Sequence, residues 1–96
     1  MFTHIAIFKW KQGTNKTDIN AALAEVEALQ NKIPDIIEIR TGENQSRFSE
    51  GYTHVVLVRG KDKEAIETYR KHPWHLLVAA KIEAMEEHGI GVDFES

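Results

Sequence analysis

Residues 3–11 read THIAIFKWK, and large apolar side chains fall on both sides of an alternating pattern in this stretch. Alternation with a period of two predicts a β-strand, because successive side chains of a strand point to opposite faces. One face carries His4, Ala6, Phe8 and Trp10, and the other carries Ile5, Ile7 and Lys9. A strand that is apolar on both faces needs cover on both.

A second stretch of the same kind lies at residues 52–59, which read YTHVVLVR. Its two faces carry Tyr52, His54, Val56 and Val58 on one side, and Thr53, Val55 and Leu57 on the other. Residues 36–44 and the short segment 90–94 complete the predicted strands, and residues 45–51 form a loop.

Helical segments separate these strands. Residues 18–33 place apolar side chains at helical spacing, with Thr17 as the predicted N-cap and Pro34 as the end. Asp62 is predicted to cap a short helix that breaks at His72, and Pro73 opens a further helix that runs to residue 88, with Gly89 as its C-cap. The order β-α-β-β-α-β predicts an α+β, ferredoxin-like subunit.

The helices of such a subunit cover one face of its sheet only. The face with His4, Phe8, His54 and Val56 is expected to look toward the helices. The other face is apolar as well, and a chain of 96 residues has no spare element to cover it. We therefore expect a second copy to pack there, giving a homodimer, a dimeric α/β barrel, with these residues mostly buried between the subunits: Ile5, Ile7, Val55 and Leu57.

Length and composition narrow the class of protein. Residues 1–96 make a single domain, and the absence of cysteine excludes disulfide scaffolds, thiolate metal sites and thiol catalysis. A formal net charge of -3 argues against nucleic-acid binding. No apolar stretch is long enough to span a bilayer, and the first residues do not resemble a signal peptide. We expect a cytoplasmic protein that binds neither nucleic acid nor a membrane.

The chemistry is expected at the five histidines, and above all in residues 69–75, YRKHPWH. A histidine can act as a general base near neutral pH, and a tyrosine hydroxyl can donate to a developing oxyanion, so Tyr69 and His75 suit proton abstraction beside a carbonyl. In the alternative interpretation, Tyr69 is a core aromatic, His75 is a helix-start residue bonded to the backbone, and His4 and His54 are structural. No histidine cluster has the spacing of a metal site, so no metal is expected, and His88 is assigned no function.

Five segments together resemble the stress-responsive dimeric α/β-barrel domain family, in particular its olivetolic acid cyclase-type members. They are HIAIFKWK (residues 4–11), IPDIIEIRTGEN (33–44), GYTHVVLV (51–58), YRKHPWH (69–75) and VDF (92–94). The resemblance implies a ferredoxin-like subunit that pairs sheet to sheet, needs no cofactor, and uses Tyr69 and His75 as its acid/base pair. The ligand is expected to contact His4, Ala6, Phe8, His54, Val56 and His72.

Two functions from different classes remain open at this point. The first is a cofactor-free cyclase or lyase, or a binder, of a largely apolar carbonyl-bearing molecule. The second is a non-catalytic, stress-associated dimer whose cavity is incidental. A haem- or quinol-oxidising protein of the same architecture is a third, weaker alternative. A ligand-sized pocket lined by the predicted residues favours the first function, and a filled interior favours the second.

Overall fold

The computed structural model describes residues 1–96. Its four strands form one antiparallel sheet in the order β2-β3-β1-β4. The elements are β1 (Phe2–Trp10), α1 (Lys16–Ala28), the 3₁₀ turn η1 (Leu29–Asn31), β2 (Ile36–Glu43), β3 (His54–Gly60), α2 (Lys63–Lys71), α3 (Pro73–Met85) and β4 (Glu86–Glu95). This order confirms the predicted ferredoxin-like fold.

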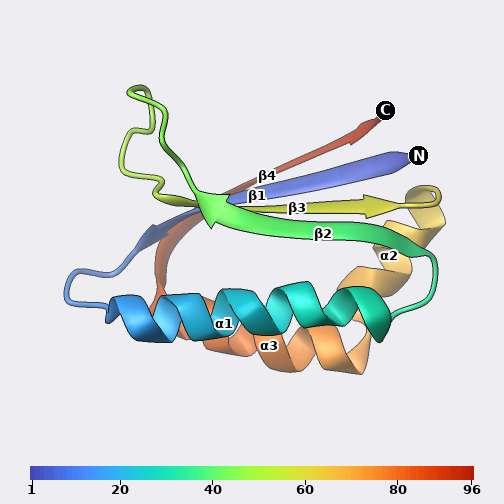
Figure 1. The fold of residues 1–96 in the computed structure, drawn as a ribbon, viewed down its shortest axis with the longest axis horizontal. Helices are drawn as coiled ribbons and strands as arrows, with labels where there is room; N and C mark the ends of the chain where they lie inside the picture. The colour runs from blue at the N-terminus through green and yellow to red at the C-terminus, as the bar shows by residue number, and fades with distance from the viewer.

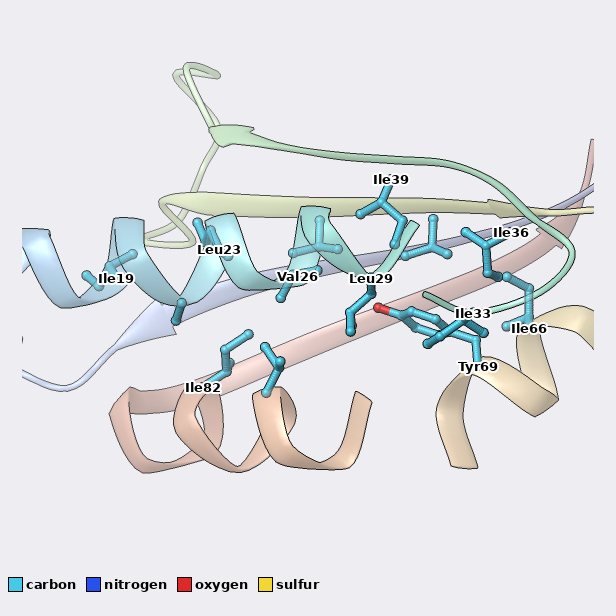
Figure 2. Close-up of a cluster of buried hydrophobic side chains, with 14 residues drawn as sticks. Ile19, Leu23, Val26, Leu29, Ile33, Ile36, Ile39, Ile66, Tyr69 and Ile82 are labelled. Atoms are coloured by element: carbon cyan, nitrogen blue, oxygen red, sulfur yellow. The ribbon is translucent and has the colours of Figure 1, made fainter. Parts of the chain in front are cut away.

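All three helices lie on one face of the sheet, as Figure 1 shows. The apolar core fills the space between the two layers and draws on every helix, on η1 and on the inner face of β2 and β3 (Figure 2). Val58 and Ile66 are its most completely buried members. The Tyr69 ring extends from α2 into this cluster, with its hydroxyl oxygen at the inner end (Figure 2).

The helix starts follow local capping chemistry. α1 is capped by Asn15, whose side-chain oxygen accepts from the backbone N–H of Thr17 at 2.7 Å, so the predicted cap at Thr17 is wrong by two residues. Asp62 caps α2 as predicted, accepting from the N–H of Ala65 at 2.9 Å. His72 ends α2 and caps α3, because its Nδ1 accepts from the N–H of Trp74 at 3.1 Å and Pro73 fills the first helical position.

The end of α3 differs from the prediction. The helix stops at Met85 rather than at residue 88, and Gly89 lies within β4 opposite Phe8 instead of capping a helix. β4 is correspondingly twice the predicted length and pairs with β1 from end to end, apart from a register shift near its start. The backbone hydrogen bonds of this long ladder favour the strand over a last helical turn whose residues, Glu86 to His88, have no apolar side to bury.

The sheet register separates two faces. Residues directly opposite one another in a ladder share a face. The inner face carries His54, Val56 and Val58, all buried beneath the helices. On the outer face, Ile5 pairs with Leu57 and Val92, and Ile7 pairs with Val55 and Ile90. In the single chain, Ile90, Val92 and Phe94 remain 40%, 48% and 43% exposed.

None of the helices has the length and apolar character needed to cross a membrane.

Candidate active site

A cavity of about 160 Å³ lies between the sheet and the helices. Six of the eight predicted site residues line it: His4, Ala6, Phe8, Val56, Tyr69 and His75. The rest of the lining comes from one residue of α1, four of α3 and the first residue of β4: Val26, Val78, Ala79, Ile82, Glu83 and Glu86. The wall is therefore mainly apolar, with a small number of polar side chains that meet in it.

The helix break brings Tyr69 and His75 together. Their ring centroids are 4.4 Å apart and the ring planes are inclined at 48°. Tyr69 projects from the last turns of α2, and His75 from the first turn of α3. The proline between them turns the chain so that side chains from two different helices share one wall of the cavity.

The tautomer of His75 follows from its hydrogen bond. Nδ1 lies 3.0 Å from the carbonyl oxygen of Arg70, and a carbonyl oxygen can only accept, so Nδ1 carries a proton. Burial lowers the pKa of His75 below its usual value of 6.5, against the opposing effect of this hydrogen bond. At neutral pH the ring is therefore uncharged and Nε2 holds a free electron pair, which is the form that a general base needs.

Tyr69 has the complementary properties. It is only 2% exposed, and burial raises its pKa to about 12, although the charge of Arg70 lowers it in part. The phenol therefore stays protonated at neutral pH and can donate a hydrogen bond to a ligand oxygen. Two neighbouring groups with such separated pKa values suit a base and an acid respectively.

His4 is held by a carboxylate that sequence reasoning left without a role. Nδ1 of His4 lies 2.6 Å from Oδ1 of Asp93, and Nη2 of Arg70 donates to Oδ2 of the same carboxylate at 2.6 Å. Burial alone would raise the pKa of Asp93, but the hydrogen bonds from Arg70 and His4 bring it below the usual value. Nη2 of Arg70 also lies 3.0 Å from Nδ1 of His4, so Asp93 and Arg70 together hold the Nδ1 side of the ring and leave Nε2 without a hydrogen-bond partner.

His54 and His72 do not line the cavity, contrary to the prediction. The ring of His54 lies near the other end of the paired strands, opposite Phe8, where its Nδ1 accepts from the indole N–H of Trp10 at 2.9 Å. His72 is occupied in capping α3. Both histidines sit in the motifs expected of a site, but their hydrogen bonds give them structural positions.

The Trp10 bond also fixes the protonation of His54 and predicts a pH dependence of stability. Because the indole N–H can only donate, Nδ1 is bare and Nε2 carries the proton, buried without a partner. Burial lowers the pKa of His54 below 6.5, opposed by the charge of Glu43 and aided by that of Lys16. Protonation would place a second N–H against Trp10, so the folded state takes up the proton less readily than the unfolded one.

The stabilising effect of neutral His54 is complete above the unfolded pKa near 6.5 and is lost as the pH falls below it. We expect the free energy of unfolding, measured with urea, to fall between pH 7 and pH 5. His54→Asn keeps an acceptor for Trp10 without titrating and should flatten this dependence, by at most about 1.4 kcal/mol per pH unit. The exposed His88→Asn is the control, and an equal flattening in that variant would contradict the assignment.

Sequence reasoning gave no role to the two acidic residues of the lining, Glu83 and Glu86. The helical pattern of residues 74–88 predicts Glu86 inside a helix, and only the observed end of α3 brings it to the cavity. No group of three or more histidine, aspartate or glutamate side chains is arranged to hold a metal ion.

Solved structures with the same fold cover nearly the whole chain. A protein of Arabidopsis thaliana superposes with a TM-score of 0.92 at 22% identity, over 100% of this chain and 95% of its own. A dimeric ferredoxin-like protein of unknown function from Jannaschia gives 0.88 at 25% identity, over 99% and 98%. The hydroxynitrile lyase of Passiflora edulis gives 0.87 at 18% identity, over 97% and 90%.

Among curated proteins, no sequence matches this one. The family model described as the stress responsive A/B barrel domain matches residues 2–96. That match takes in all four strands and all three helices, together with the cavity between them. The chain belongs to the stress-responsive A/B barrel domain family.

Proposed function

We propose that this protein is a cofactor-free lyase or cyclase that moves a proton next to the carbonyl carbon of a small, largely apolar molecule. The observation that carries the proposal is the Tyr69–His75 pair in the wall of the cavity, with ring centroids 4.4 Å apart. One partner is an uncharged base with a free Nε2, and the other is a protonated phenol.

In the proposed reaction, Nε2 of His75 takes a proton from the ligand, and the Arg70 carbonyl stabilises the resulting imidazolium through Nδ1. The Tyr69 hydroxyl donates to the ligand oxygen on which negative charge develops. His4, held by Asp93, offers Nε2 as a third polar contact and orients the ligand. The apolar remainder of the wall excludes water and strengthens these interactions.

The size of the cavity limits the ligand. A cavity of roughly 150 Å³ accepts a benzene molecule, so about 160 Å³ suits one ring with a short substituent. A long-chain precursor of the olivetolic acid cyclase type would extend beyond this pocket. A lyase reaction on a single-ring compound fits better, and one structural neighbour is named a hydroxynitrile lyase.

Cleavage of a hydroxynitrile illustrates how the pair would act. The base removes the hydroxyl proton, the oxygen electrons form the carbonyl, and the carbon–carbon bond breaks with its electron pair leaving on cyanide. The imidazolium then returns the proton to cyanide, so the protein ends the cycle unchanged. No redox partner is required at any step.

Two assays test the proposal. One follows cleavage of the cyanohydrin of benzaldehyde by the absorbance of the aldehyde, and the other follows deuterium uptake beside the carbonyl of acetophenone by NMR. We expect the protein to accelerate at least one of them over buffer at the same pH. If neither is accelerated, the non-catalytic, stress-associated dimer becomes the better interpretation.

We also propose that the protein is a homodimer joined through the outer face of its sheet. Three of the apolar residues on this face are more than a third exposed in the single chain, a large apolar surface for a small protein. The Jannaschia neighbour is described as dimeric. The helices occupy the opposite face (Figure 1), so such a contact leaves the helix side of each subunit free.

A further inference from the structure

Two carboxylates without a counter-ion lie in the cavity wall. Glu83 is exposed and stands on α3 in line with His75 and Ala79, at intervals of four residues, so these three side chains share one helix face. The negative charge of Glu83 raises the pKa of His75, whereas burial of the ring lowers it. Glu86 is half-buried at the first position of β4. Neither carboxylate takes part in an ion pair.

A bulge in β4 directs Glu86 to the cavity. The ladder pairs Lys9 with His88 and Trp10 with Glu86, so Glu87 is an extra residue without a partner on β1. Without the bulge, Glu87 would take the position opposite Trp10, and bulges commonly re-aim side chains next to functional sites. Gly89 leaves room for the redirected side chain of Glu86, because a Cβ at position 89 would lie 2.6 Å from Oε2 of Glu86.

Two cations that bond groups near the cavity wall have other partners than Glu83 and Glu86. Arg70 donates to Asp93 at 2.6 Å and forms a weaker pair with Glu67 at 3.5 Å. Lys11 donates its Nζ to the carbonyl oxygen of Ala84 at 3.1 Å. Because no cation lies within ion-pair distance of Glu83 or Glu86, their charges act on whatever enters the cavity.

We propose that Glu83 and Glu86 are specificity-determining residues that admit uncharged and cationic ligands and reject carboxylates and other anions. The inference rests on the proposed function and names the charge class of its substrate. Tyr69 lies at the buried end, whereas Glu83 is at the exposed rim. Glu83 and Glu86 therefore repel a negative charge that the ligand already carries when it enters. An oxyanion formed during the reaction instead accepts a hydrogen bond from the Tyr69 hydroxyl.

Three molecules of nearly the same shape test this selectivity: benzamide is neutral, benzoate is anionic and benzamidine is cationic. Their dissociation constants are measured at pH 7.5 by NMR titration, following the ring signals of His75 and Tyr69. We expect benzoate to bind about tenfold more weakly than benzamide, since the two carboxylates repel it through a partly aqueous medium. Benzamidine should bind at least as tightly as benzamide.

The double variant Glu83→Gln, Glu86→Gln keeps the size of both side chains and should bring benzoate within about twofold of benzamide. The matched control is Glu87→Gln, the exposed bulge residue, which should leave the ratio unchanged. Equal affinities for benzoate and benzamide in the unsubstituted protein would overturn the inference while leaving the proposed function intact. If none of the three ligands shifts the His75 or Tyr69 signals, the cavity is not a ligand site and both proposals fail.

Discussion

Replacing His75 with alanine is expected to lower kcat/KM for the active assay by about 10²–10⁴-fold, the usual contribution of a general base. The change removes Nε2 of His75, the proposed base, whose ring lies against that of Tyr69. It also removes one hydrogen bond to the Arg70 carbonyl, a loss of about 1 kcal/mol in the free energy of unfolding. The measurement is therefore kcat/KM together with the melting temperature and the oligomeric state.

The partner substitution Tyr69→Phe separates chemistry from packing. The ring stays in the core, so stability should change little, while loss of one oxyanion donor should cost about 10²-fold in kcat/KM. His88→Ala is the matched control, because His88 is exposed and bonds only the Tyr52 hydroxyl. If His75→Ala lowers the melting temperature and leaves turnover unchanged, the pair is structural.

The pH profile gives an independent readout of the same assignment. The pKa of His75 in the free protein lies below 6.5, so kcat/KM should hold its full value at neutral pH and fall only as the pH drops below that figure. The phenol, with a pKa of about 12, should produce no loss of activity up to pH 10.

Most of the fold could be predicted because local signals and the required packing agree. Alternation marks β1 and β3, and Asp62 and Pro73 mark two helix starts through hydrogen bonds made within three residues. The end of α3 could not be predicted in the same way. Gly89 looks like a helix cap locally, but its conformation is set by pairing with β1, some eighty residues earlier in the chain.

In the site, too, contacts between residues close in sequence could be predicted, and contacts between distant residues could not. Tyr69 and His75 are neighbours because only a helix break separates them, so the motif YRKHPWH predicts their meeting. The bond between His4 and Asp93 depends on the register of β1 with β4, which no short motif shows. The prediction that His54 lines the site is wrong because alternation tells which face of the sheet a residue is on, but not whether its place along the strand lies beside the cavity. His54 is on the same face as Val56 but two residues along β3, alongside Trp10.

Replacing Val92 with aspartate is expected to convert the proposed dimer into a monomer. Val92 lies on the outer face opposite Ile5, near the middle of β4, and is 48% exposed in the single chain. A twofold interface carries the substitution twice, so two carboxylates would lose water in an apolar contact without partners. At roughly 2 kcal/mol or more for each, the dissociation constant should rise at least about 10³-fold.

Sedimentation equilibrium at micromolar concentrations measures the change, with Leu76→Asp as the control. Leu76 is also a large exposed apolar residue, but it lies on α3, on the side of the sheet that the helices cover, where an acidic residue in the first turn suits the helix dipole. Because β4 is an edge strand and Val92 points away from the core, Val92→Asp should retain its circular dichroism spectrum. A folded Val92→Asp variant that remains dimeric would place the contact elsewhere, and a monomeric unsubstituted protein would leave the apolar outer face without its proposed cover.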